Sequence, residues 1–379
     1  MKEFGRPRSS VPMHGIAQWL VVVCVAGVMF SCAQSWATPL VADARLGLPA
    51  ISIPATNPLT PAKIALGRKL FFDQRLSADD TISCAKCHVP EKGFSDGRPL
   101  ALGVSGQLGS RKTPSLLNVA LTTSEFWDGR RPTLEVQALD PLFNPREHGL
   151  TDSDSLLALL RSDPAYREAF RDAFGIAPGQ IHREHIGEAI ASFERTLLAG
   201  DSAFDRYEYA DSKSAMSASS QRGLVLFRGR AQCASCHTIG ADAASFSDEQ
   251  FHSLGVGFSK IEARLDKTAT RAANSTPDEL DRLILSDADV AELGRFNVTK
   301  HPADIGKFKT PSLRNVALTG PYMHDGSVKT LEDAVDMEVY YRSLEANRPL
   351  ILTPAEKTDL VAFLQSLTSP YALALGGKK

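Results

Sequence analysis

One feature constrains the fold of this chain more than any other: a block of sequence that occurs twice. Residues 112–138 and 309–335 align without a gap and are identical at 15 of 27 positions. Agreement at this level indicates that one structural unit was duplicated within the chain. We therefore predict two related domains, at residues 38–200 and 201–379.

The N-terminus has the pattern of an export signal. Basic residues at positions 2, 6 and 8 precede an apolar run at 16–30, and small residues follow at 35 and 37. The run is short for a membrane span. We predict a signal peptide over residues 1–37 and a periplasmic mature protein with no membrane span after processing; an uncleaved anchor is the alternative. The net charge of −2 gives no reason to expect nucleic acid as a partner.

Each predicted domain contains one Cys-X-X-Cys-His motif. In an exported protein, four cysteines can form two disulfides, and a zinc site or a thioredoxin-like pair are further alternatives. Zinc needs four ligands from one region, whereas each motif supplies three. The pattern is that of haem c attachment, in which both thiols bond the porphyrin and the histidine ligates iron. We predict two covalently bound haem c groups, held by Cys84, Cys87 and His88, and by Cys233, Cys236 and His237.

Helical spacing of apolar residues dominates the rest of the chain. Thr-Pro at 60–61 and at 353–354 begins two predicted helices, 61–72 and 353–364. No alternating strand pattern stands out, so we predict a mainly α fold with long loops. Further helices are predicted at 152–161, 163–174, 181–198 and 220–227.

The two copies differ by an insertion. The second copy carries 48 more residues between its motif histidine and the repeated block. This segment, roughly residues 240–300, is polar, so we expect a loop that serves as a lid or a partner surface.

With these motifs the chain resembles the bacterial di-haem cytochrome c peroxidase family, which includes MauG-type enzymes. The resemblance runs from about Pro61 to Leu367. It rests on both cysteine motifs, Leu-Phe-Phe-Asp at 70–73, Phe-Trp-Asp-Gly-Arg at 126–130 and Pro-Tyr-Met-His-Asp-Gly at 321–326. It implies two cytochrome c-like helical domains across a pseudo-twofold axis. It also implies that the N-terminal haem reacts with hydrogen peroxide while the C-terminal haem relays electrons.

The resemblance implies roles for individual residues. His88 and His237 match the proximal iron ligands. Trp127 matches a tryptophan that couples the two haem groups, and it is the only tryptophan outside residues 1–37. His324 takes its place in the second copy, as expected if such a coupling is needed once.

On the distal side of the N-terminal haem, Gln137 matches the catalytic glutamine, Pro141 the proline over the iron and Glu147 the distal glutamate. As the O–O bond breaks, peroxide loses a proton from its inner oxygen and gains one on its outer oxygen. One carboxylate can make both transfers. We expect Glu147 to do so, with Gln137 orienting peroxide or water. His148 is a second candidate, because imidazole suits the same task.

Two differences from the family pattern concern the irons. Many family peroxidases cap the N-terminal iron with a histidine eight residues before Lys112, where this chain has Val104. We therefore expect an N-terminal haem that is open to peroxide without pre-reduction. The family register places the sixth ligand of the second haem at Glu338, and the internal repeat agrees. A carboxylate or phenolate there lowers the potential, whereas methionine raises it; the alternatives are Tyr341, Tyr340 and Met337.

A third difference concerns calcium, which the family binds between its domains. Lys112 occupies the position of the family's asparagine ligand, while Thr319 and Pro321 match its main-chain ligands. Since an ammonium group could replace the cation, we expect weak or absent calcium binding.

We predict a periplasmic peroxidase that reduces hydrogen peroxide to water with electrons from a small donor, a cytochrome c or a copper protein. One alternative is a MauG-type enzyme that uses peroxide to oxidise a protein or organic substrate. Another is a di-haem electron carrier without catalysis, against which Glu147, Gln137 and the open iron argue. The resemblance also allows a homodimer.

Overall fold

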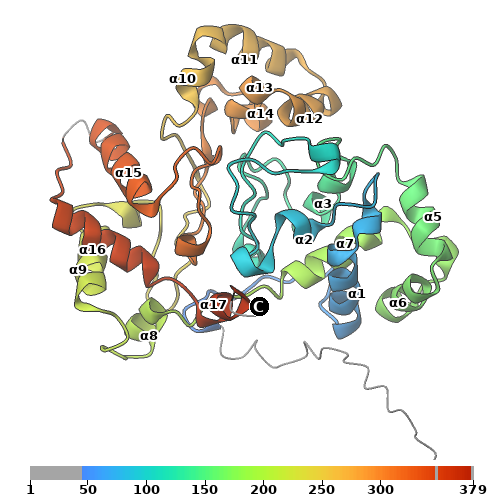
Figure 1. Ribbon diagram of the computed structural model, residues 1–379, viewed down its shortest axis with the longest axis horizontal. Coiled ribbons are helices and arrows are strands. Elements are labelled where there is room, and N and C mark those ends of the chain that lie inside the picture. The colour runs from blue at the N-terminus through green and yellow to red at the C-terminus, as the bar shows by residue number, and fades with distance from the viewer. Residues whose placement is uncertain (1–44, 346–348, 377–379) are drawn as a thin grey trace, which may run out of the picture. The chain divides into compact units, whose positions relative to one another are not determined.

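The computed structural model describes residues 45–345 and 349–376 (Figure 1). The predicted signal peptide lies outside these residues. The predicted mainly α fold is confirmed: the described strands, β1 (Phe251–His252) and β2 (Phe308–Lys309), form one short antiparallel pair with Phe251 opposite Lys309. The helices of the first half are α1 (Pro61–Phe72), α2 (Cys84–Cys87), α3 (Leu134–Gln137), α4 (Asp140–Phe143), α5 (Asp154–Ser162), α6 (Pro164–Phe174) and α7 (Arg183–Glu194). Those that follow are α8 (Ala203–Tyr209), α9 (Ala218–Arg228), α10 (Phe258–Ile261), α11 (Leu265–Asn274), α12 (Pro277–Ser286), α13 (Ala288–Glu292), α14 (Phe296–Thr299), α15 (Leu331–Glu345), α16 (Pro354–Gln365) and α17 (Pro370–Gly376).

Helices α1 and α7 form the centre of the N-terminal core. The Thr60 hydroxyl accepts a hydrogen bond from the Lys63 amide and caps α1, as the sequence predicts. Gly67 lets the two helices approach closely, because a Cβ there would lie 1.8 Å from the Ala189 carbonyl oxygen. Phe71 and Phe193 pack across this contact with ring centroids 5.1 Å apart.

Helices α9 and α16 repeat this packing in the C-terminal core. A Cβ on Gly223 of α9 would lie 2.0 Å from the Asp359 carbonyl oxygen of α16. Phe227 and Phe363 pack across the contact at 4.9 Å. Phe71 of α1 and Phe227 of α9 therefore occupy equivalent positions, each on the helix that precedes a cysteine motif. The described residues, 45–345 and 349–376, belong to one compact unit, so the domain limits at 200/201 stay a prediction.

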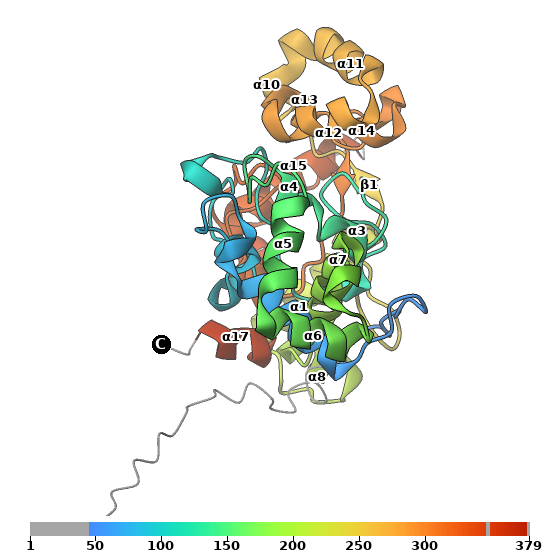
Figure 2. The same ribbon diagram turned by 90° about the vertical axis from the view of Figure 1, so that its right-hand side faces the viewer.

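The insertion is helical, and the expectation of a polar loop is wrong. Helices α10 to α14 form a separate helical group (Figure 1, Figure 2). These helices are only 4 to 10 residues long, so each offers few turns over which a helical pattern can be recognised in the sequence. Their own hydrophobic core consists of Ile261, Ala272, Leu280, Ile284, Val290, Leu293 and Phe296.

A buried ion pair holds the second repeat block to α8. The Arg314 guanidinium forms two hydrogen bonds with the Asp205 carboxylate, at 2.8 and 2.9 Å, and both side chains are fully buried. It also donates to the Ala244 carbonyl at 2.8 Å. The first repeat has Leu117 at the matching position, so this pair belongs to the second copy alone.

Replacing one partner leaves the other charge buried and unpaired. We expect Arg314→Met to lower the free energy of unfolding by about 3–5 kcal/mol, measured by urea denaturation of the haem-loaded protein with circular dichroism. Arg206→Ala, which removes the exposed pair with Asp201, is the control and should cost less than about 1 kcal/mol. Equal effects of the two changes would contradict this account.

Candidate functional site

A cavity of about 1200 Å³ extends between the two cysteine motifs. Its wall contains residues of both repeat blocks, of α3, α7 and α15, and of the insertion. The structure therefore brings together most of the residues that the sequence singles out: Cys84, Cys87, His88, Trp127, Gln137, Pro141, Glu147, His148, Cys233, Cys236, His237, His324 and Glu338.

The two motif histidines are held in the same way. His88 Nδ1 lies 3.0 Å from the Phe94 carbonyl oxygen, and His237 Nδ1 lies 2.9 Å from that of Phe246. A carbonyl only accepts, so Nδ1 carries the proton and Nε2 keeps its lone pair. Burial lowers the pKa of both imidazoles to about 4, so both are neutral at pH 7. A neutral, oriented imidazole is the form that ligates a metal.

The four cysteines of the motifs form no disulfide with one another, so the disulfide alternative is not observed. Burial raises the pKa of Cys84, and it raises that of Cys87 and Cys233 to about 12. Reactive redox cysteines and zinc ligands need a stabilised thiolate, which this surrounding disfavours. Two cysteines and one neutral histidine on a large, mainly apolar cavity fit haem c at each motif.

Gln137, Pro141 and Glu147 line the N-terminal part of the cavity. Asn144 Nδ2 donates to Glu147 Oε1 at 2.7 Å and fixes the carboxyl group. Burial raises the pKa of Glu147, and the nearby positive charge of Arg130 opposes that rise. The carboxyl group is therefore held in a fixed position in the cavity wall, with a raised pKa.

The other distal candidates differ in their surroundings. His148 Nδ1 lies 2.8 Å from the Leu76 carbonyl, and burial lowers the pKa of this histidine, so its ring is neutral and tied to the scaffold. Val104 is buried, and its amide donates to the Glu147 carbonyl at 2.9 Å. The segment that would carry a capping histidine in the family is thus attached to the main chain of the distal glutamate.

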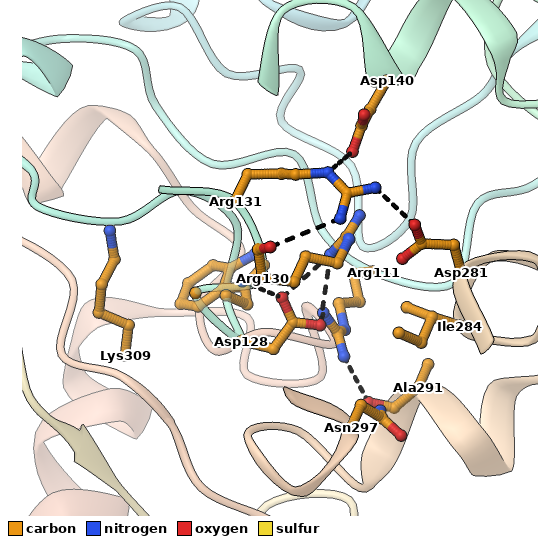
Figure 3. A network of polar contacts seen from close by, with 12 residues as sticks. Arg111, Asp128, Arg130, Arg131, Asp140, Asp281, Ile284, Ala291, Asn297 and Lys309 are labelled. Atoms are coloured by element: carbon orange, nitrogen blue, oxygen red, sulfur yellow. Dashed lines mark hydrogen bonds and ion pairs between the residues drawn. The ribbon is translucent and has the colours of Figure 1, made fainter. Parts of the chain in front are cut away.

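Asp128 is the centre of a clamp beside this site (Figure 3). Its fully buried carboxylate lies 2.7 Å from Arg111 Nη1 and 3.1 Å from Arg130 Nη1. Burial alone would raise the pKa of Asp128, but the two guanidinium groups hold it well below its usual range. The clamp positions Arg130, whose guanidinium carbon lies 3.4 Å from the centroid of the Phe126 ring and whose side chain reaches the cavity.

The insertion is attached to the same side of the cavity (Figure 3). Arg111 Nη2 donates to the Ala291 carbonyl of α13 at 2.6 Å. Arg131 bridges Asp140 of α4 and Asp281 of α12, at 2.7 and 2.5 Å. The helices α12 and α13 thereby brace the loops that carry the distal residues.

Trp127 is fixed by both copies of the repeat. Its Nε1 donates to the Lys112 carbonyl at 3.0 Å, and its own carbonyl accepts from the Lys309 amide at 2.8 Å. The Lys112 amide in turn donates to the His324 carbonyl at 2.8 Å. Since Lys112 and Lys309 are the first residues of the two repeat blocks, the tryptophan lies where the blocks meet.

The Lys112 ammonium group points toward the loop that follows the first cysteine motif. It donates to Ser95 Oγ at 2.9 Å and to the Thr113 carbonyl at 3.1 Å. Burial lowers the pKa of Lys112 to about 8. Reduced calcium binding stays a prediction.

Helix α15 carries all four residues considered for the sixth ligand of the second haem. Glu338 is the one that lines the cavity, on the same face as Val335 and Arg342. It lies close enough to Cys233 and Arg342 for its charge to act on both. Tyr340 is 60% exposed, and Tyr341 packs against Gly255. Helical geometry therefore favours Glu338 over its neighbours.

Sequence reasoning missed two carboxyl groups of the cavity wall, Glu125 and Glu194. Both are buried, and burial raises the pKa of each. The one signal available in the sequence is that Glu194 ends an otherwise apolar face of α7. Glu125 lies 69 positions away in the sequence, so proximity along the chain does not link the two residues.

In the described parts of the chain, 45–345 and 349–376, no helix is long and apolar enough to cross a membrane.

Comparisons with known proteins agree with this geometry. The sequence profile of the di-haem cytochrome c peroxidase family matches residues 61–213. The methylamine utilization protein MauG of Methylorubrum extorquens is 35% identical, over 97% of this chain and 99% of that protein. The cytochrome c551 peroxidase of Pseudomonas aeruginosa is 33% identical, over 82% and 80%. The solved structure of a MauG-like protein associated with microbial copper homeostasis is similar with a TM-score of 0.68 at 32% identity, over 90% and 97%.

Attachment of haem by these cysteines predicts a defined loss on substitution. The mass of the denatured wild-type protein should include two haem groups. The double variants Cys84→Ala/Cys87→Ala and Cys233→Ala/Cys236→Ala should each retain one, because each motif bonds its own haem. Retention of two covalent haem groups in either variant would contradict the assignment.

Proposed function

Since the chain belongs to the di-haem cytochrome c peroxidase family, we propose that it is a periplasmic enzyme that reduces hydrogen peroxide to water. The reaction consumes two electrons and two protons for each peroxide and yields two water molecules. A small redox protein, a cytochrome c or a copper protein, supplies the electrons. The observation that carries this proposal is the fixed and buried Glu147 carboxyl group in the cavity wall with Gln137.

Haem c, held by Cys84, Cys87 and His88, supplies an iron that binds peroxide and exchanges electrons. Glu147 accepts the proton of the inner peroxide oxygen and returns it to the outer one. Its raised pKa suits both steps, because it brings the acid form closer to neutral pH than in an ordinary glutamate while the base form stays available. The amide group of Gln137 orients peroxide or water, and Arg130 keeps a positive charge beside the carboxylate.

The two halves of the chain divide the work in this proposal. The half at 38–200 performs the chemistry, and the half at 201–379 receives electrons. Trp127 couples the two, since hydrogen bonds fix it where both repeat blocks meet.

A second candidate function is oxidation of a protein or organic substrate at the expense of peroxide, as in a MauG-type enzyme. The position of Glu338 on the cavity face of α15 favours it. A carboxylate ligand would stabilise the oxidised second haem and make it a poor acceptor of electrons from a typical cytochrome c.

Removal of the Glu147 carboxyl group should remove acid–base catalysis. We expect Glu147→Gln to slow the reaction of the fully oxidised protein with peroxide by about 10²- to 10⁴-fold. In the wild type the rate constant should rise with pH through a pKa above the usual glutamate value, because burial raises that pKa and only the ionised form is a base. Stopped-flow absorbance measures both effects, and exposed Glu168→Gln is the control.

Three outcomes of this experiment bear on the function. Rapid reaction followed by oxidation of an added reduced cytochrome c supports the peroxidase. Rapid reaction without oxidation of the donor supports the MauG-type alternative. Absence of reaction with peroxide, both in the fully oxidised protein and after reduction of one haem, supports a pure electron carrier and contradicts the proposal.

The ligand assignment of Glu338 has a spectroscopic test. Glu338→Gln should change the electron paramagnetic resonance signal of the second haem and raise its midpoint potential, because an anionic ligand is lost. The controls Met337→Leu, Tyr340→Phe and Tyr341→Phe should leave both unchanged. A change in one of these controls, with none in Glu338→Gln, would assign the ligand to that residue instead.

A further inference from the structure

Glu194 has a feature that the proposed mechanism does not use. It is the last residue of α7, its exposed fraction is 5%, and its Oε2 atom is buried without a hydrogen-bond partner. Buried polar atoms are almost always paired, so such an oxygen calls for an explanation. The side chain forms part of the cavity wall together with Ile190, one helical turn earlier.

The charges around Glu194 favour its neutral form. Burial is the main cause, and the carboxyl groups of Glu125 and Glu135 add to it, while Arg195 opposes it. Arg195 is committed elsewhere: its guanidinium forms two hydrogen bonds with Glu135, at 2.6 and 3.0 Å. Together these groups raise the pKa of Glu194 to about 8, so the carboxyl group can exchange a proton in the neutral to mildly alkaline range.

Glu194 lies at a different edge of the N-terminal cavity from Glu147. Among the charges that raise the pKa of Cys84, that of Glu194 has the largest effect, whereas for the pKa of Cys87 it is that of Glu147. A haem bonded to both cysteines would therefore have one carboxyl group beside each attachment point. Glu147 would serve the peroxide, and Glu194 would be left for another role.

We propose that Glu194 is a redox-linked proton site of the N-terminal haem, which binds a proton when that haem gains an electron and releases it when the electron leaves. The electron comes from a one-electron donor and the proton from solvent. The haem's charge falls by one and the carboxylate becomes a carboxylic acid, so the net charge of the cavity is unchanged. An uncompensated charge in a buried site is costly, which couples the two transfers.

Glu125 connects this site toward the surface. Its Oε1 atom accepts a hydrogen bond from Thr122 Oγ1 at 2.8 Å, and Lys309 and Glu249 are among the charges that act on it. Glu249 Oε2 accepts from the Thr123 amide at 2.9 Å, in an exposed contact. Electrostatic influence thus extends from Glu194 to Glu125, and from Glu125 to Glu249 at this exposed contact.

The test is a redox titration of the haem-loaded protein at a series of pH values, which needs no peroxide and so does not depend on the proposed peroxidase activity. In the wild type, the midpoint potential of the N-terminal haem should fall with rising pH between about pH 6 and 9, because the ionised carboxylate stabilises the oxidised haem. In Glu194→Gln this dependence should vanish. The variant should match the wild type at the acidic end and lie above it at the alkaline end.

Two further variants make the test decisive. Glu184→Gln changes an exposed carboxyl group of the same helix and should keep the wild-type profile. Glu125→Gln removes the neighbouring negative charge, so the pH range over which the midpoint potential falls should persist but move to lower pH. This variant provides the test if Glu194→Gln fails to load haem. Parallel profiles in wild type and Glu194→Gln, or an unmoved pH range in Glu125→Gln, would overturn the proposal.

Discussion

The cost of burying charge around one large cavity governs the chemistry of this protein. Several ionisable groups in the wall are either neutral or paired. The motif histidines are neutral because burial lowers their pKa and a main-chain carbonyl holds the proton on Nδ1. Asp128 keeps its charge because two arginines clamp it. Glu147 and Glu194 have neither solution in full, and a carboxyl group in that condition is the kind that exchanges protons during a reaction.

The duplicated blocks keep the same backbone but differ in the side chains on which function depends. Phe126 and Met323 occupy matching positions, and both have positive φ, 66° and 69°. The next position holds Trp127 in one copy and His324 in the other. Two side-chain amides, from Asn118 and Asn315, also donate to the same Ala199 carbonyl, at 3.2 and 3.3 Å. The backbone symmetry brings the copies together, and the side-chain asymmetry gives one copy the tryptophan.

Short-range signals account for what could be predicted from the sequence. Capping residues and apolar spacing predict α1 and α16 to within a residue or two, since both depend on local chemistry. The cysteine motifs predict the cofactor for the same reason. The register from Trp127 to Glu147 predicts a set that the structure does bring to one cavity.

Long-range packing accounts for the features that could not be predicted from the sequence. The environment of Glu194 depends on Glu125, which belongs to a different segment, so neither residue reveals the pair alone. Met337 and Glu338 are adjacent in sequence, and the orientation of α15 alone separates them. The helices of the insertion could not be predicted because short helices such as these are stable only through their shared core.

That core explains how the insertion can act on both copies of the repeat at once. Adjacent residues of α13 contact different copies: the Ala291 carbonyl accepts from Arg111, and Glu292 Oε2 lies 2.7 Å from His324 Nε2. The His324 ring stacks on Phe308 with centroids 3.6 Å apart. A loop could not hold both contacts in register, whereas a helix anchored by its own hydrophobic core can. The insertion therefore ties the clamp beside Glu147 to the residue that stands in the place of the tryptophan, and the two halves of the cavity share one support.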